Sequence, residues 1–415
     1  MFDGRVRRRP TTSEHVGRKH RPDYWLVVLA AILLVIGLVV VYAISPGASQ
    51  SKGVSEGYYV SKQMIAIALG LVAFIALSQI PYKLWRKASY LLIFLAVIAA
   101  LAVQLFGSRV NGAYRWIQVG GMSFQAAELI KFALLVWLAN FLADRKSAGQ
   151  LNDQQRTLKP LMIALGAILV VVAMLQSDLG STGVMIAMMA AMVYMIGLPL
   201  KRIFMIGGIV LVALVLATTM VGYRRNRLAT FLHPASDCQN TGYQSCQALI
   251  AVGSGGMFGL GLGRSVQAHG YVPEAANDSI FAILAEIFGF VGVTIIIGVY
   301  VAFFSRLARI IERAPDDFAR LLVTGVLAWF SVQAFINIGA MIGLLPLKGI
   351  TLPFVSYGGT SLLFVTGALG IVFQISRYTT YGSIDTLRSG EGNEDTGALR
   401  RGIGRAYHAH LGRRP

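Results

Sequence analysis

Two carboxylates accompany one strongly apolar segment, in the stretch AANDSIFAILAEIFGFVG at residues 275–292. Asp278 comes directly before the apolar run, and Glu286 lies about two helical turns inside it. Burying an ionised carboxylate in hydrocarbon costs several kcal/mol or forces the group to become neutral. We therefore expect at least one of the two to serve the protein's chemistry. The structural alternative for Asp278 is a helix cap, because Asp is favoured at that position and suits the helix dipole.

Three further ionisable residues lie in or beside apolar segments. Glu128 and Lys131 are three residues apart and so share one face of a helix. Either they neutralise each other and fix helix packing, or Lys131 points into an outward cavity and binds an anionic substrate while Glu128 holds it. Both arrangements can hold together. Asp178 stands in the short turn QSDLGS between two apolar segments and is the second candidate for a base.

Two basic residues stand in polar stretches between the apolar segments. Arg115 lies in the outward loop NGAYRWIQVGG, and its planar fork of donors suits phosphate oxygens. Lys348 lies in LLPLKGITLPFVSYGGTSLL, whose glycines and prolines fit an irregular backbone that lines a cavity. For either residue the ordinary alternative is solvation. The glycine-rich run GSGGMFGLGLG completes no G-x-G-x-x-G pattern, so we interpret it as a closely packed surface loop rather than a nucleotide site.

Long apolar blocks must position these residues. The chain has 415 residues, of which 55% are hydrophobic and only 13% charged, whereas a soluble domain carries about a quarter charged residues. Most of the blocks are long enough to cross a hydrocarbon layer about 30 Å thick. We expect ten spans, at residues 25–44, 63–80, 89–106, 127–142, 160–176, 181–199, 203–221, 279–304, 321–342 and 355–376. The predicted fold class is an all-α polytopic membrane protein.

The formal charge of +18 is explained by topology rather than by nucleic acid. Alternate loops between the expected spans are basic, which predicts that these loops and both termini lie in the cytoplasm, close to anionic membrane lipids. The basic residues of those loops are Lys83, Arg86, Lys87, Arg145, Lys146, Arg156, Lys159, Lys201, Arg202, Arg306, Arg309, Arg313 and Arg320. We expect no cleavable signal peptide, because the first apolar run reads as a retained helix.

Three regions organise the chain. Residues 1–24 form a basic cytoplasmic tail, residues 25–376 a single membrane domain, and residues 377–415 a polar tail without apolar periodicity that we expect to be disordered. Within the membrane domain, residues 222–278 form the one large extracytoplasmic loop. Its two cysteines, Cys238 and Cys246, either form a disulfide in an oxidising compartment or remain free thiols, and we expect the disulfide.

Several separated motifs, in this order along residues 22–378, resemble the SEDS family of bacterial membrane proteins, named for shape, elongation, division and sporulation. They are NGAYRWI (111–117), QAAELIKF (125–132), QSDLGS (176–181), YQSCQALIAVGSGGMFGLGLG (243–263), PEAANDSIFAILAEIFGFVG (273–292) and LPLKGITLPFVSYGGTSLL (345–363). RPDYWL and KGITLPF look more like the division branch than the elongation branch. The chain departs from the family pattern at Ala126 and Ser177, where proline is usual, and at Ile287, where a second glutamate is usual.

The resemblance implies a ten-helix glycosyltransferase that polymerises lipid II, the undecaprenyl-pyrophosphate-linked disaccharide-peptide, into peptidoglycan. It implies a site at the division septum of the cytoplasmic membrane, with a class B penicillin-binding protein and other divisome membrane proteins as partners. Asp278 is then the catalytic base. The candidates to meet the pyrophosphate are, in order of preference, Arg115, Lys131 and Lys348, and Glu128, Asp178 and Glu286 complete the candidate substrate site. A divalent cation could assist, although the sequence contains no clear ligand cluster.

Three rival functions remain open at this point. A transporter that flips the same lipid would also have about ten spans with a few buried charges, but its ionisable groups should lie near the membrane midplane. An elongation-type polymerase would perform the same reaction elsewhere in the cell. A scaffold for the partner transpeptidase would not depend on the Asp278 carboxylate.

Overall fold

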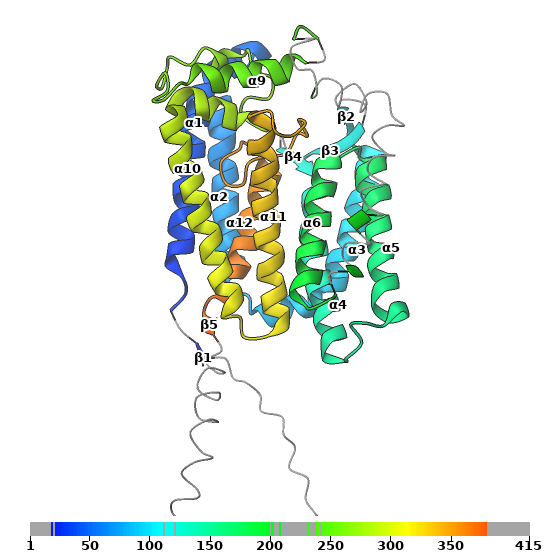
Figure 1. Ribbon diagram of the computed structural model, residues 1–415. Coiled ribbons are helices and arrows are strands. Elements are labelled where there is room, and N and C mark those ends of the chain that lie inside the picture. Colours follow the sequence, from blue (N-terminus) through cyan, green and yellow to red (C-terminus); the bar gives the residue numbers. More distant parts are fainter. Residues whose placement is uncertain are drawn as a thin grey trace, which may run out of the picture.

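Long apolar helices dominate the computed structural model, which describes residues 18–19, 21–110, 113–119, 122–199, 201–202, 207–208, 231, 238–240 and 242–379. Within these residues, seven helical segments are long and apolar enough to cross a membrane. They are α1 (Tyr24–Lys52), α2 (Tyr58–Gln79), α3 (Tyr82–Phe106), α4 (Ala126–Ser147), the joined helices η1 (Gln154–Leu158), α5 (Lys159–Ile168) and η2 (Leu169–Leu175), α10 (Ile280–Glu312) and α11 (Asp317–Met341). Figure 1 shows these helices standing side by side in one bundle. Two shorter apolar helices, α6 (Leu179–Met195) and α12 (Gly359–Ile375), complete the bundle within the described chain.

The predicted spans agree with this arrangement wherever the structure describes them. Nine of the ten coincide with helical segments of the described chain, and the predicted span 203–221 lies almost wholly outside the described residues. The helices α4, α10 and α11 bury most of their surface, whereas α2 and α3 leave much apolar surface exposed. Apolar side chains exposed on the outside of a bundle are what a lipid-facing surface requires. The chain is a membrane protein of the all-α class.

A small antiparallel sheet covers one end of the bundle, where the sequence predicted only a loop. Its strands are β2 (Ser108–Val110), β3 (Ala113–Val119) and β4 (Met122–Gln125), paired in the order β2-β3-β4. Trp116 on β3 faces Gln125 on β4, directly before α4 begins. The sheet therefore joins the end of α3 to the start of α4. We call this the sheet end of the molecule; α9 (Tyr243–Ser254) lies at the same end (Figure 1).

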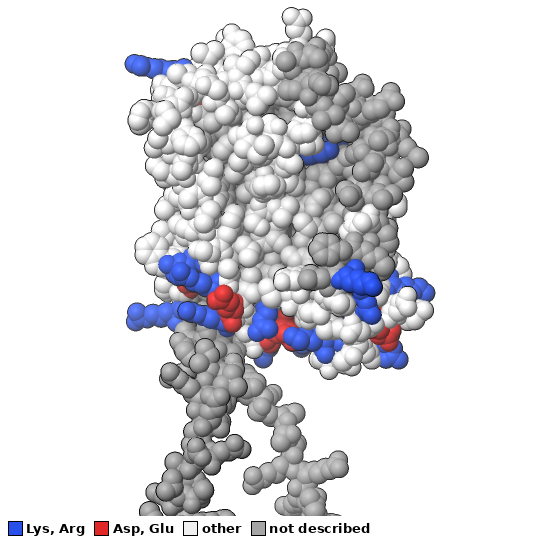
Figure 2. Space-filling model, in the orientation of Figure 1, with Lys and Arg blue, Asp and Glu red and all other residues white. Residues whose placement is uncertain are grey.

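Charged side chains gather at the opposite end, which we call the charged end. Figure 2 shows Lys and Arg, with Asp and Glu among them, in a belt around this end, and an almost uncharged wall above it. Ion pairs in the belt join different helices: Lys146 of α4 lies 2.7 Å from Asp317 of α11, and Arg86 of α3 pairs with Asp144 of α4. A two-residue antiparallel pairing of β1 (Arg18–Lys19) with β5 (Tyr378–Thr379) lies at the same end (Figure 1).

A break divides α10 at Gly289, whose φ of 66° and ψ of −171° are not helical. The glycine-rich segment 255–261 lies against this break and completes its backbone hydrogen bonds. The four bonds run from Leu260 N to Glu286 O (2.9 Å), from Gly261 N to Ile287 O (3.0 Å), from Phe290 N to Gly256 O (2.9 Å) and from Val291 N to Met257 O (3.0 Å). A Cβ at Gly259 would lie 2.1 Å from Ile287 O, so only glycine permits this approach. The interpretation of the run as a closely packed loop is confirmed.

A disulfide joins two residues within the large loop. Cys238 and Cys246 form a disulfide with a Cα–Cα distance of 5.6 Å, as expected. Cys246 lies in α9, the short helix that packs against α10. The disulfide therefore ties the chain that precedes α9 to α9 itself.

Candidate functional site

Asp278 lies in the turn that leads into α10, at the sheet end of the bundle. Ser279, not Asp278, is the residue that precedes the helix, and the Ser279 side chain makes no capping hydrogen bond. Asp278 therefore stands one residue outside the cap position, within the limits that the sequence predicted. The N-cap position itself is occupied by Ser279.

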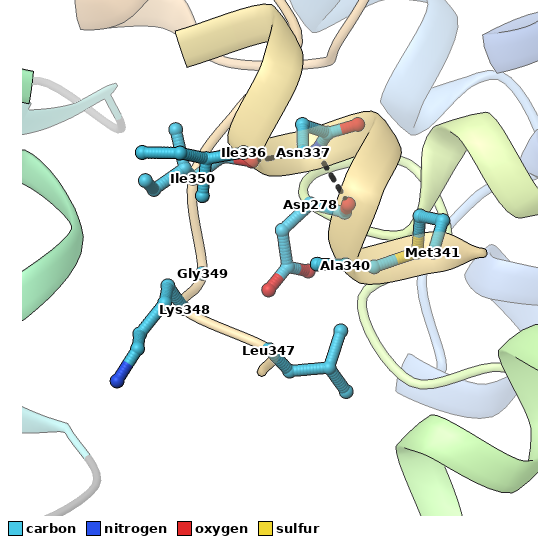
Figure 3. A pocket seen from close by; sticks show the side chains of 9 residues that line it. All are labelled: Asp278, Ile336, Asn337, Ala340, Met341, Leu347, Lys348, Gly349 and Ile350. Atoms are coloured by element: carbon cyan, nitrogen blue, oxygen red, sulfur yellow. Dashed lines mark hydrogen bonds between the residues drawn. The ribbon is translucent and has the colours of Figure 1, made fainter. Parts of the chain in front are cut away.

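Asp278 lines a very small pocket, with a cavity volume of about 10 Å³, roughly the space that one water molecule needs. Three segments form its walls: the turn before α10, the end of α11 and the segment 347–350. The lining residues are Asp278, Ile336, Asn337, Ala340, Met341, Leu347, Lys348, Gly349 and Ile350. Figure 3 shows the Asp278 carboxylate pointing toward Gly349, while the Lys348 side chain extends away toward the open side. A Cβ added at Gly349 would lie 3.5 Å from Asp278 Oδ2, so a side chain at this position would contact the carboxylate.

The backbone that carries Asp278 is held on three consecutive residues. The carbonyls of residues 276, 277 and 278 each accept a hydrogen bond from a group distant in sequence. Tyr357 N donates to Ala276 O (2.8 Å), Ser356 Oγ donates to Asn277 O (2.6 Å), and Asn337 Nδ2 donates to Asp278 O (2.7 Å). Because both the main chain and its neighbours are buried or half-buried, these bonds fix the direction in which the Asp278 side chain leaves the backbone.

Glu128 and Lys131 form a buried ion pair in α4. Lys131 Nζ lies 2.8 Å from Glu128 Oε1 and 3.2 Å from Gln333 Oε1, and only 1% of Lys131 is exposed. Gln333 also accepts from Trp329 Nε1 at 2.8 Å, and its Nε2 donates to Thr351 O at 2.9 Å. The mutually neutralising arrangement is thus the one present. Through Gln333 the pair is connected to the segment that follows Lys348.

Arg115 and Asp178 meet at the turn between η2 and α6. Arg115, on β3, donates from Nε to Gln176 O at 2.8 Å and from Nη2 to Ser177 O at 2.7 Å. Asp178 caps α6, accepting from Ser181 N at 2.9 Å and from Ser181 Oγ at 2.8 Å. The backbone of Ser177 has a φ of 51°, which proline cannot adopt, so the turn shape at this departure from the family pattern depends on the residue present. Arg115 therefore binds the sheet to the turn before α6, and Asp178 caps the first turn of α6.

Glu286 anchors the large loop to α10. Its Oε1 accepts from Val266 N at 3.0 Å and from Gln267 N at 3.2 Å, and its Oε2 accepts a short hydrogen bond from Ser265 Oγ. The side chain is buried, with 1% exposed. A buried carboxylate with three donors around it is a stable structural arrangement. Of the two carboxylates in the opening stretch, Asp278 is the one that lies in a pocket.

Two further properties concern the protonation of Tyr357 and the binding of metal ions. Burial, and to a smaller extent the neighbouring Tyr58 and Tyr59, raises the pKa of Tyr357 to about 12, so Tyr357 stays protonated at neutral pH. Among the described residues, no group of three or more His, Cys, Asp or Glu side chains comes together in a way that could hold a metal ion.

A second hollow is larger but unsuited to a reaction. It has a volume of about 460 Å³ and lies between α3, α4 and the α5–η2 helix, lined almost entirely by apolar side chains such as Leu134 and Ile163. None of its lining residues is ionisable. The Asp278 pocket is thus the better place for proton transfer.

Sequence reasoning missed Gln333 and Asn337. Both are buried polar residues on α11, one turn apart, and both donate to the segment 350–351 opposite Asp278. The signal that could have found them is two amides spaced i and i+4 in an otherwise apolar span, which places them on one helix face.

The chain is similar in sequence to known proteins. Residues 24–381 match the model of the FtsW, RodA and SpoVE family, described as cell cycle proteins. A probable peptidoglycan glycosyltransferase FtsW of Saccharophagus degradans is 38% identical over 364 residues, which cover 86% of this chain and 92% of the relative. Stage V sporulation protein E of Bacillus subtilis is 35% identical over 367 residues, or 88% of this chain and 99% of the relative.

The fold also matches a solved structure. A chain of a peptidoglycan synthase complex, described as coordinating polymerization and crosslinking, superposes with a TM-score of 0.70. The two sequences are 25% identical, and the match covers 86% of this chain and 98% of the other.

Proposed function

Because the chain belongs to the FtsW, RodA and SpoVE family of cell cycle proteins, we propose that it is a peptidoglycan glycosyltransferase that polymerises lipid II during cell division. The family match covers residues 24–381, and the similarity to a relative named FtsW extends over 86% of this chain. Lipid II is the substrate because its pyrophosphate-linked sugar provides both the donor and the leaving group that strand polymerisation requires.

The Asp278 pocket is the observation that carries the mechanism. The carboxylate takes the proton of the acceptor sugar's 4-hydroxyl while that oxygen forms a bond to the donor's anomeric carbon. The bond between the anomeric carbon and the pyrophosphate oxygen breaks in the same step, and the lipid pyrophosphate leaves. A single displacement of this kind inverts the configuration of the sugar and forms no covalent enzyme intermediate.

Positive charge must balance the departing pyrophosphate. Lys348 is our first candidate, since it shares the pocket with Asp278 and extends toward its open side. Arg115 follows, although its guanidinium already holds two backbone carbonyls. Lys131 comes last because it is enclosed in the bundle beside Glu128. This order differs from the one expected from sequence, which began with Arg115.

We further propose an orientation and a partner. The charged end faces the cytoplasm and the sheet end faces outward, because basic residues accumulate on the cytoplasmic side of membrane proteins. Asp278 then works at the outer surface of the cytoplasmic membrane, at the division septum. A class B penicillin-binding protein crosslinks the strands beside it, in line with the synthase complex to which the fold is similar.

Replacement of Asp278 by Asn tests the proposal. The amide keeps the size of the side chain but cannot take a proton, so the polymerisation rate should fall by about 10²- to 10⁴-fold. The measurement is glycan polymer formed from purified lipid II by the protein with its transpeptidase partner, analysed on a gel. Folded yield and partner binding should stay at wild-type levels, because Asn keeps the size of the side chain and its ability to accept hydrogen bonds.

Asp316→Asn provides the matched control. Asp316 caps α11 through a 2.7 Å bond from Ala319 N at the charged end, and Asn retains this acceptor. Its polymerisation rate should stay close to that of the wild type. A near-normal rate for Asp278→Asn would remove Asp278 as the base and move the search to Asp178. Transport of lipid II without any polymer from the wild-type protein would favour the flippase instead.

A further inference from the structure

The Asn337 side chain bridges the two chain segments that form opposite walls of the Asp278 pocket. Its Nδ2 donates to Asp278 O at 2.7 Å and to Ile350 O at 2.7 Å. Figure 3 shows both bonds, with Asn337 on α11 between the turn before α10 and the segment 348–350. Both partners are carbonyl oxygens, which only accept, so the nitrogen of the amide must face them.

Few side chains can replace Asn337 in this position. Two carbonyls need two N–H donors from one atom, and the primary amide of Asn supplies them at neutral charge. Only 2% of the residue is exposed, so water has little access to the two carbonyls if the amide is removed. Loss of the donors would leave two buried acceptors that the remaining structure must satisfy by moving.

The two bonds set the width of the pocket. One holds the main chain of Asp278 itself, and the other holds Ile350, two residues after Lys348. Asn337 therefore links the main chain of Asp278 to the main chain beside Gly349, the residue whose missing Cβ would lie 3.5 Å from Asp278 Oδ2. Displacements of about 1 Å in such an arrangement cost much of the rate of a proton transfer.

We propose that Asn337 is a positioning residue, which sets the Asp278 carboxylate against the Lys348–Gly349 edge of the pocket. The inference rests on the proposed role of Asp278 as the base. Asn337 acts through Asp278 and through the segment 348–350, and it does not itself exchange a proton. Its loss should lower the rate of the chemical step more than the affinity for substrate.

The test compares Asn337→Leu with Asn140→Leu. Asn140 is also buried, and its amide donates to Ser89 Oγ at 3.2 Å and accepts from Arg86 Nε at 3.0 Å near the charged end, far from the pocket. Both variants remove a buried amide of the same size. Thermal unfolding in detergent measures the stability loss of each, and steady-state polymerisation of lipid II with the partner present gives kcat and KM.

Asn337→Leu should lower kcat by about 10- to 100-fold with KM within about twofold of wild type, while Asn140→Leu lowers the unfolding temperature but keeps kcat. Asn337→Ser, whose hydroxyl can serve only one carbonyl, should give an intermediate kcat and remains testable if the Leu variant does not fold. In an Asp278→Glu background, where the carboxylate is already displaced, Asn337→Leu should cost a smaller factor than in the wild type.

Three results would overturn the proposal: a kcat for Asn337→Leu or Asn337→Ser that equals the wild-type value, an equal loss of kcat in Asn140→Leu, or the same factor lost in the Asp278→Glu background. Failure of the proposed function looks different. In that case Asp278→Asn keeps its rate, or the wild-type protein makes no polymer, whatever Asn337 does.

Discussion

At the scale of single residues, Lys131 shows how this membrane protein keeps a charge in its interior. The ammonium has a carboxylate at 2.8 Å, an amide oxygen at 3.2 Å and the ring of Trp329 at 5.2 Å from its centroid. Each contact offsets part of the cost of removing the charge from water. The ion pair is therefore a unit, and either partner alone would be a buried and uncompensated charge.

Removal of Lys131 alone should be worse than removal of the pair. Lys131→Ala leaves the Glu128 carboxylate buried without its cation, which costs about 3–5 kcal/mol in comparable pairs. Lys131→Ala combined with Glu128→Ala leaves only neutral groups, so the yield of folded protein should recover in part. Size-exclusion profiles of the purified variants measure that yield. A double variant that folds no better than the single one would mean that Lys131 has a separate role.

Residue types predicted part of the site, and partners distant in sequence explain the rest. The spacing of Glu128 and Lys131 on one helix face was sufficient to predict their pairing, because the two are neighbours within a single turn. Asp278 was singled out by its place before an apolar run. The two carbonyls that Asn337 serves lie 59 and 13 residues away in the chain, and no local pattern encodes that meeting.

At the scale of elements, the broken helix α10 depends on a loop for its continuity. Segment 255–261 supplies donors and acceptors to both sides of the break at Gly289. Gly259 has a φ of 79°, which favours glycine, and its missing Cβ makes room for Ile287 O. Any side chain at this position would separate the loop from the helix.

Gly259→Ala should destabilise the protein by about 1–3 kcal/mol, through a strained backbone and the forced separation from α10. Gly253→Ala is the matched control: Gly253 lies within α9 with open space around its missing Cβ, and alanine favours the helix. Thermal unfolding of the two variants should show a lower midpoint for the first and an equal or higher one for the second. Equal midpoints would show that the loop contributes nothing to the stability of α10.

The same elements show where sequence patterns stop being informative. Long apolar runs predicted the described helices because a membrane span has a required length. The sheet formed by β2, β3 and β4 was missed: seven residues of mixed polarity between glycines, at 113–119, are equally compatible with a loop. The break in α10 was not visible either, since Gly289 sits in an apolar run that reads as one continuous helix.

At the scale of the whole molecule, the charged residues and the candidate site lie at opposite ends of the helix bundle. The charged end carries the belt of Lys, Arg, Asp and Glu, and the pocket, the sheet and α9 lie at the other end (Figures 1 and 2). Under the proposed orientation, every ion pair between helices described at the charged end faces the cytoplasm, and the chemistry faces outward.

Cysteine labelling in intact cells tests this orientation. The two native cysteines are bonded to each other, so they should not react with a thiol reagent. A thiol reagent that cannot cross the membrane should modify a cysteine introduced at Ser55, in the exposed turn between α1 and α2, and should not modify one at Ser147, at the end of α4. Lysed cells should label at both positions. Labelling of position 147 alone in intact cells would reverse the topology and the site assignment with it.

The break in α10 depends on a segment that is synthesised before the helix. The segment 255–261 precedes α10 in the chain, so it has left the ribosome before the helix begins to emerge. When residues 286–291 reach the membrane, the backbone groups that complete them are already there. An open amide or carbonyl at that depth would cost several kcal/mol until a partner arrived. The segment that completes the backbone hydrogen bonds of α10 is thus synthesised before the helix that depends on it.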